Sequence, residues 1–461
     1  MTTNINSMRT PHNYYANLVK HQELSLIPHF TLESGHQLRS VPIAYKTWGT
    51  LNESGSNCIV LCHALSGSAD AEDWWQPLMG RGKAFDPRRF FIFCANMLGS
   101  PYGSASPLTI NPETGRQYGP EFPRTSVRDD VRIQKMVLDQ LGVSEVAAVI
   151  GGSMGGMATL EWPLCTPVGY VKNIIPITTS AYHSAWGIAW GETQRMSIYA
   201  DVKFSNGWYN PEPSGQPIEG LGTARMIAML TYRSHNSFEE RFSRRPATRR
   251  KQPTPVVPTG LTTPPSPSSS EASTPLLCQG ESPRNPQSTP YMSQNGQVPM
   301  EFAAQSYLQY QAAKFLNRFD ANCYIHLTAK MDSHDVTRDR LPTHLGLDIP
   351  IPPRNEHLKH VFKNVPPQAL VISVETDVLF RAEQQIQLAE TLPEAKFLNL
   401  ESQDGHDGFL LEFEALSRAI TSHLRERCPW LYATGFEAFS GGVRSDEVIS
   451  SVFGEAESGE F

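Results

Sequence analysis

Residues 146–162 read VAAVIGGSMGGMATLEW, and this stretch decides the fold. Its first five residues form a short apolar run, typical of a buried parallel strand. The pattern G-x-S-x-G follows with Ser153 at its centre, and the next residues favour a helix. A serine between strand and helix occupies a tight turn above the sheet, as an activated nucleophile does, and the small residues at 151, 152, 155 and 156 allow the close approach. The alternative is a glycine-rich structural or phosphate-binding turn, but the lysine of a P-loop is missing.

The flanking sequence predicts alternating strands and helices. Residues 30–48 alternate in polarity around Ser34-Gly35, which predicts a hairpin. A helix is predicted over 126–141, ended by Gly142, and others over 303–319 and 409–424. Short apolar runs predict further strands at residues 57–65, 89–96, 171–177, 369–374 and 396–400. This alternation favours an α/β fold with a doubly wound, mostly parallel sheet.

Composition narrows the class of protein. The 461 residues carry a net charge of −7, which gives no basic footprint for nucleic acid. The seven cysteines include no CxxC pair, which favours a reducing compartment over a disulfide framework or zinc site. The N-terminus has no apolar signal segment, and no apolar run has the length of about 18 residues that a membrane span needs. We therefore expect an intracellular globular enzyme that binds neither nucleic acid nor membrane.

A serine nucleophile needs a base, and in this topology the acid and the histidine follow it in the chain. Asp377 comes just after the strand predicted to end at Val374, and His406 lies in a Gly-flanked loop after the next strand. His406 would take the proton of Ser153, and Asp377 would fix its tautomer. Glu375 and Asp404 are competing candidates for the acid.

The oxyanion of an acyl-transfer intermediate needs two backbone N–H groups. One is expected on Met154, the residue after the nucleophile, and the other in the loop 62–67, with Leu65 as the favoured donor. His63 precedes the serine in the chain, so a structural role is expected for it. The sequence DSHD at 332–335 could suggest a metal, but no further ligands accompany it and we predict none.

Several longer segments resemble homoserine O-acetyltransferases of the fungal type. They include HALSGSA (63–69), VIGGSMGGMATLEW (149–162), TSAYHSAWGIAWGETQR (179–195), TARMIAMLTYRS (223–234) and QDGHDGFLLEF (403–413). The likeness runs from about residue 22 to 425. It implies an α/β-hydrolase fold with a helical lid, and Ser153, Asp377 and His406 as the triad.

The resemblance also implies the substrates. Arg225 and Asp407 would contact the carboxylate and ammonium of homoserine, with Tyr232 lining the same site. A zwitterionic acceptor needs one cation and one anion at fixed separation, and the planar fork of arginine suits a carboxylate. The family uses acetyl-CoA as co-substrate without a bound cofactor, works as cytoplasmic homodimers and feeds methionine synthesis.

We predict five segments: an N-terminal extension (1–28), a first core segment (29–178), the lid (179–367), a second core segment (368–427) and a disordered acidic tail (428–461). Proline, serine and threonine dominate residues 245–299, which predicts a disordered insert within the lid. Pro163 is expected to end or kink the helix behind the nucleophile, because proline cannot donate its backbone hydrogen bond.

The expected reaction is double displacement through an acetyl-serine. Three alternatives stay open: another hydroxyl acceptor such as L-serine or deacetylcephalosporin C, an esterase in which water takes the acetyl group, and a binding protein without activity. An intact triad disfavours the last. Acetyl and succinyl donors are not distinguished by the residues alone.

Overall fold

The computed structural model describes residues 3–4, 13–247, 301–341 and 354–433. They divide into a large unit (residues 1–241 and 308–461) and a small one, Phe242–Tyr307. In the small unit, backbone hydrogen bonds from Ala247 N to Glu301 O and from Ala303 N to Arg245 O join the two ends that flank residues 248–300. Most of the predicted insert, and the predicted tail after residue 433, lie outside the described residues.

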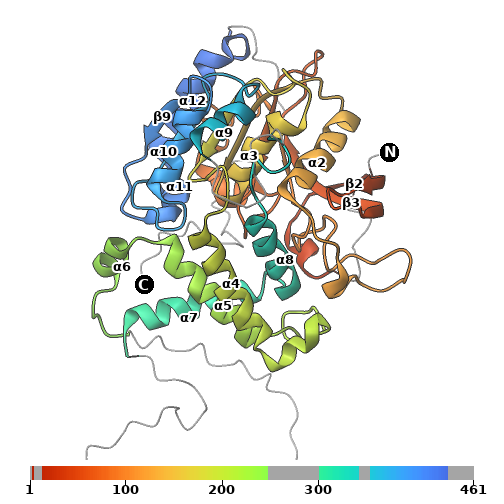
Figure 1. Cartoon of the computed structure of the whole chain (residues 1–461), viewed down its shortest axis with the longest axis vertical. Coiled ribbons are helices and arrows are strands. Elements are labelled where there is room, and N and C mark those ends of the chain that lie inside the picture. The colour runs from red at the N-terminus through yellow and green to blue at the C-terminus, as the bar shows by residue number, and fades with distance from the viewer. Residues whose placement is uncertain (1–2, 5–12, 248–300, 342–353, 434–461) are drawn as a thin grey trace, which may run out of the picture. The chain divides into compact units, whose positions relative to one another are not determined.

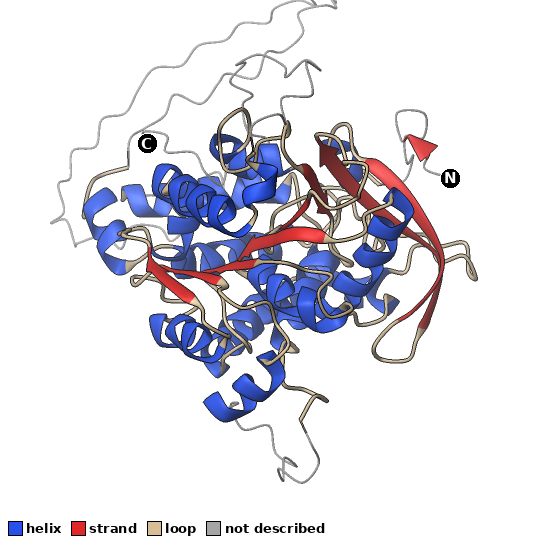
Figure 2. Ribbon diagram, turned by 90° about the horizontal axis from the view of Figure 1, so that it is seen from above, coloured by secondary structure: helices blue, strands red, loops and turns tan. Residues whose placement is uncertain are grey.

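The large unit is built on one sheet of nine strands in the order β1-β2-β3-β5-β4-β6-β7-β8-β9 (Figures 1 and 2). The six strands from β5 to β9 in this order run parallel, and β1, β2 and β3 are antiparallel to their neighbours. The strands are β1 (Thr3–Asn4), β2 (Glu23–Thr31), β3 (Gln37–Trp48), β4 (Cys58–Cys62), β5 (Phe91–Ala95), β6 (Val146–Gly152), β7 (Ile174–Ile177), β8 (Leu370–Ser373) and β9 (Lys396–Asn399). The predicted hairpin and mostly parallel sheet are confirmed, and β2 crosses the boundary predicted at residue 29.

Both faces of the sheet are covered, which explains the continuous apolar runs. Along β4, Val60 joins one buried cluster while its neighbours Ile59 and Leu61 join another, because successive side chains of a strand point to opposite faces. The first face carries α2 (Val127–Leu141), α3 (Met154–Cys165), α9 (Asn355–Phe362) and α10 (Ala382–Thr391), and the second carries α1 (Ala71–Trp75) and α12 (Phe413–Arg427). Figure 2 shows helices on both sides of the strands.

Helix boundaries follow local chemistry. At α2, Ser126 and Asp129 form a capping box, and Gly142 adopts a left-handed conformation with φ of 84° at its end, as predicted. Helix α3 contains Pro163 and ends two residues later at Cys165. The helix predicted over 409–424 is instead two helices, α11 (Gly408–Leu411) and α12, because Glu412 has a non-helical ψ of 52°.

A group of helices connects β7 to β8, where the lid is predicted. It comprises α4 (Ala185–Tyr199), α5 (Ile218–Tyr232), α6 (His235–Arg241), α7 (Ala303–Leu316) and α8 (Ala321–Asp332), followed by α9. Helix α4 packs against α5 and α8, and these three lie below the sheet in Figure 1. Helix α9 instead packs against α10 beside the sheet. At the other end, Cys428 and Leu431 of the predicted tail are buried in the core. Among the described residues, no helix is long and apolar enough to cross a membrane.

Candidate active site

Ser153 occupies the junction between β6 and α3, at the carboxyl edge of the parallel strands. Its backbone has φ of 59° and ψ of −126°, a strained conformation for a residue with a side chain. Two contacts hold it there: the Ser153 N–H donates to Ile177 O at 3.0 Å, and Thr179 Oγ1 donates to Ser153 O at 2.9 Å. The sequence therefore folds into the predicted tight turn, with the serine side chain at the strand ends.

The glycines around Ser153 are needed for space. A Cβ on Gly155 would lie 2.0 Å from the carbonyl oxygen of Cys62, and one on Gly151 would lie 2.5 Å from Gly155 O. A Cβ on Gly156 would lie 2.5 Å from the Thr179 side chain. Distances below 3.0 Å to backbone leave no room for alanine, so the predicted close approach of strand and helix is confirmed.

Asp377 and His406 form a buried pair. His406 Nδ1 lies 2.7 Å from Asp377 Oδ2, and the other carboxylate oxygen accepts the N–H groups of Leu379 and Phe380 at 2.8 and 2.9 Å. These contacts fix the carboxylate and leave His406 Nε2 as the nitrogen that could act as base. Of the competing acids, Glu375 is exposed and Asp404 pairs with other residues.

Aromatic rings enclose the His406 imidazole. Phe380 stacks on it with a centroid distance of 5.3 Å, Phe409 meets it edge-on at 5.4 Å, and Tyr232 lies at 6.1 Å. A Cβ on Gly152 would lie 2.5 Å from the Phe409 ring. One ring therefore contacts both the residue before Ser153 and the imidazole, which brings the serine turn and His406 to the same edge of the sheet.

Electrostatics favour the protonated form of His406. Burial disfavours the charge, but the charge and hydrogen bond of Asp377, together with the charge of Asp407, raise the pKa of His406 above its usual value. A base with a raised pKa accepts a proton readily, and it is neutral and active only at pH values above that pKa.

The loop at residues 62–67 faces the start of α3, because Gly155 approaches Cys62 so closely. Met154 and Leu65, the two predicted oxyanion donors, are both buried. His63 contacts backbone at both ring nitrogens: Nδ1 lies 2.8 Å from Ala64 O, and Nε2 lies 3.0 Å from Met97 N. These contacts agree with the structural role expected of His63.

Arg318, which sequence reasoning missed, joins this loop to the helices between β7 and β8. Its Nη1 donates to the carbonyl oxygen of Ser66 at 2.9 Å, and its guanidinium lies 5.0 Å from the Phe315 ring centre. Arg318 comes just after α7 and is separated from Ser66 by 252 residues. Only the folded chain could reveal this contact, because no local pattern marks it.

Two of the predicted acceptor residues lie near each other. Arg225 is a buried residue of α5, and its guanidinium lies 4.7 Å from the Phe315 ring centre and 5.4 Å from that of Tyr232. Tyr232 also faces His406, so side-chain contacts lead from the guanidinium of Arg225 through the Tyr232 ring to the His406 imidazole.

Asp407 is already held by a second arginine. Arg233 Nε lies 3.1 Å from Asp407 Oδ2, and Arg233 Nη1 also pairs with Asp404. Sequence reasoning missed Arg233, although it directly follows Tyr232 in the segment TARMIAMLTYRS.

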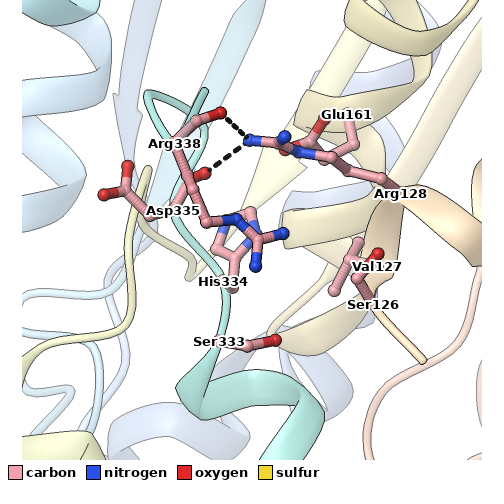
Figure 3. Close-up of a pocket in the computed structure, with 8 residues that line it drawn as sticks. All are labelled: Ser126, Val127, Arg128, Glu161, Ser333, His334, Asp335 and Arg338. Atoms are coloured by element: carbon pink, nitrogen blue, oxygen red, sulfur yellow. Dashed lines mark hydrogen bonds and ion pairs between the residues drawn. The ribbon is translucent and has the colours of Figure 1, made fainter. Parts of the chain in front are cut away.

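A separate polar cluster lies further along α3, around a small pocket lined by Arg128, Glu161, Asp335 and Arg338 (Figure 3). Arg128 contacts Glu33 at 2.8 Å and Glu161 at 3.3 Å, and it donates to the backbone oxygens of Asp335 and Arg338. Glu161 is eight residues from Ser153, about 12 Å along the helix. This cluster therefore secures a loop and does not belong to the catalytic edge.

The sequence profile of the α/β hydrolase fold family matches residues 57–413. Together with the sheet and the serine turn, this match places the chain in the α/β-hydrolase family. A structure of a homoserine O-acetyltransferase from Bacillus anthracis covers 87% of this chain and 97% of its own, with a TM-score of 0.66 and 21% identity. The structure of esterase E22 covers 87% and 99%, with a TM-score of 0.67 and 22% identity. A transferase and an esterase match equally well, so the fold alone does not separate the two activities.

Sequence similarity is more specific. A homoserine O-acetyltransferase of Cryptococcus neoformans var. grubii is 45% identical over 96% of this chain and 96% of its own length. The homoserine O-acetyltransferase of Saccharomyces cerevisiae is 45% identical over 95% and 94%. The chain belongs to the homoserine O-acetyltransferase family and is an acyltransferase enzyme.

Proposed function

We propose that this enzyme transfers the acetyl group of acetyl-CoA to the hydroxyl of L-homoserine, as a cytoplasmic, homodimeric enzyme of methionine synthesis. The observation that carries the proposal is the position of the Asp377–His406 pair between the serine turn and two charged groups, Arg225 and Asp407. A cation and an anion beside one general base suit an acceptor that is itself a zwitterion.

In the first half-reaction, His406 Nε2 takes the proton of Ser153 Oγ as this oxygen attacks the thioester carbonyl. The N–H groups of Leu65 and Met154 would stabilise the resulting oxyanion. The C–S bond then breaks, and His406 returns its proton to the CoA thiolate. The products are free CoA and an acetyl ester on Ser153.

In the second half-reaction, His406 takes the proton of the acceptor hydroxyl, which attacks the acetyl-serine. The ester bond to Ser153 breaks, and the serine oxygen recovers its proton from His406. Arg225 would hold the acceptor carboxylate, and Asp407 its ammonium. Because the hydroxyl of homoserine lies two carbons beyond the α-carbon, both anchors act at a distance from the bond that forms.

Hydrolysis is the second candidate, because the same acetyl-serine reacts with any water that reaches it. The equal structural match to esterase E22 supports keeping it. The family's sequence similarity and the charge pair near His406 favour the amino-acid acceptor. L-Serine, deacetylcephalosporin C and a succinyl donor remain alternatives for the substrates.

The decisive experiment measures CoA release by the purified enzyme with acetyl-CoA or succinyl-CoA and a panel of acceptors. We expect acetyl-CoA with L-homoserine to give the highest kcat/KM and O-acetylhomoserine as product. Equal CoA release with and without any amino acid, with free acetate as product, would instead identify an esterase.

A further inference from the structure

Arg233 forms ion pairs with the carboxylates of Asp404 and Asp407, which lie on either side of His406 in the chain. It follows α5 directly, its side chain is 8% exposed, and it pairs with Asp404 and with Asp407 at 3.1 Å. Asp404 and Asp407 stand two residues before and one residue after His406. A single guanidinium therefore spans the turn that presents the base.

The backbone around this turn fits closely against the end of α5. Gly405 has φ of 67°, and a Cβ there would lie 2.6 Å from Ser234 N. Ser234 Oγ donates to Gln403 O, and Ser237 Oγ donates to Asp404 Oδ1 at 2.6 Å. The backbone that carries Arg233 is therefore held close to the backbone of the His406 loop.

The charges that face His406 come from three elements. The loop after β8 contributes Asp377, the His406 loop contributes Asp407, and the segment after α5 contributes Arg233, which pairs with Asp407 and with Asp404. Tyr232 adds a neutral ring, and His183 lies beyond Phe380, stacked on it at 5.8 Å. The carboxylates of Asp377 and Asp407 favour the protonated base, and the guanidinium of Arg233 lies against the second of these carboxylates.

We propose that Arg233 is a positioning residue that acts on both half-reactions: it holds Asp407 in place for the acceptor ammonium, and its guanidinium compensates the carboxylate charge of Asp407 and Asp404 beside His406. The acceptor part of this proposal rests on the proposed function. The charge part concerns acetylation of Ser153 alone, which involves no acceptor.

The test compares Arg233→Met, Arg233→Lys and Asp407→Asn with the wild type. The rate of the CoA burst with acetyl-CoA alone is followed against pH, and the KM for homoserine is measured separately. The burst rate should fall at low pH as His406 becomes protonated, and we call this part of the pH profile the acid limb. Arg233→Met should move the acid limb to higher pH by about 0.5–1 unit, since it leaves two carboxylates less compensated. Asp407→Asn should move the limb to lower pH. Opposite shifts are not expected from loss of folding.

Arg233→Lys keeps the charge, but its compact ammonium does not reproduce the planar fork that contacts both carboxylates. We expect its acid limb to match the wild type and its KM for homoserine to rise about tenfold, as for loss of one charged hydrogen bond. A wild-type KM in Arg233→Lys would overturn the positioning part. An unchanged limb in Arg233→Met would overturn the charge part.

Arg128→Met is the matched control, because Arg128 also contacts two carboxylates but lies away from His406. It should lower thermal stability while leaving the burst limb in place. If Arg233→Met does not fold, Arg233→Gln replaces it, because glutamine is neutral but polar, and it must move the limb to higher pH. If the wild type shows a burst but no use of homoserine, the proposed function fails while the charge part is still tested by the burst.

Discussion

Arg128 and Arg233 make the same kind of contact in two regions of the molecule. Arg128 joins Glu33, at the turn between β2 and β3, to Glu161 on α3, and it also binds two backbone oxygens after α8. Arg233 joins Asp404 to Asp407 across the His406 turn. In both regions an arginine with about a tenth of its side chain exposed connects segments that are distant in the chain.

The two regions differ in what lies beside the carboxylates. Next to Glu161 are Arg340, Arg128 and His334, and all three lower the pKa of Glu161 against the effect of burial. His334 is itself buried, and burial lowers its pKa to about 4. Next to Asp407 is a histidine whose pKa the carboxylates raise. The same ion pair therefore contributes to stability in one region and adjusts a base in the other. The identity of the neighbour, not the strength of the pair, separates a structural from a functional arginine.

The comparison depends on His406 serving Ser153, and the largest expected effect tests this. Ser153→Ala should lower turnover by roughly 10⁴–10⁶, because members of a triad act as a unit. Intact-mass spectrometry after mixing with acetyl-CoA should show an acetyl adduct on the wild type and none on the variant. An adduct of equal yield on Ser153→Ala would assign the nucleophile elsewhere.

Removing the ion pairs of Arg128 should lower the stability of the fold without changing the rate of the reaction. Arg128→Met removes one of two arginine partners of Glu161, which is only 1% exposed. Because Arg340 still pairs with Glu161, we expect the loss of a charged hydrogen bond, about 1.5–3 kcal/mol in the free energy of unfolding. Denaturant unfolding should report this loss, with kcat per folded molecule unchanged. Arg338→Met is the control, because its pair with Glu33 is 38% exposed on the arginine side and should contribute about 0–1 kcal/mol.

The sequence predicts the catalytic edge better than the lid, and the reason is locality. The turn at Ser153 is marked by four glycines within three residues of it, and a Cβ on any of the four would lie 2.5 Å or less from backbone or side-chain atoms. Asp377 could be found because strand ends of one parallel sheet meet at one edge. The sequence already favours Asp377 over Asp404, and in the structure Asp377 Oδ2 lies 2.7 Å from His406 Nδ1 while Asp404 pairs with Arg233.

Arg233 and Arg318 could not be predicted because their partners are remote. Arg233 is 171 residues from Asp404, and Arg318 is 252 residues from Ser66. A lone arginine in a helical region is indistinguishable from a surface charge in one sequence. The break at Glu412 was missed for a related reason: the apolar spacing continues through it, while the backbone turns to bury Phe409 and Leu410 beside the site.

The variant Arg225→Lys tests whether Arg225 binds the carboxylate of the acceptor. The variant keeps the charge but loses the fork that binds a carboxylate at two points, at a cost of roughly 1.5–3 kcal/mol, or about ten- to a hundredfold. The loss should appear in kcat/KM for homoserine, with the acetylation burst nearly unchanged. Slow acetylation together with normal use of homoserine would show that Arg225 serves the donor instead.

The smallest expected effect is a difference in pH dependence between the region of His406 and the region of Glu161. His406 must be neutral to act, and its pKa is raised above about 6.5, so the acetylation rate should fall as pH drops through a value above 6.5. A raised pKa in the folded state means that protonation of His406 stabilises the fold, a contribution present below about 6.5 and lost as pH rises through the raised value. Acid inactivation in this range is therefore not unfolding.

The pKa of Glu161 is shifted in the opposite direction to that of His406, so its contribution to stability depends on pH in the opposite sense. Its pKa is lowered in the folded state, so its contribution to stability is present above the unfolded value of about 4.3 and is lost as pH falls through the lowered value. As the pH falls through the raised pKa of His406 and on towards about 5, we expect activity to disappear reversibly while tryptophan fluorescence and the unfolding midpoint stay nearly constant. Parallel loss of fluorescence and activity in this window would mean that one transition controls both, and that the two arginine clusters do not act independently.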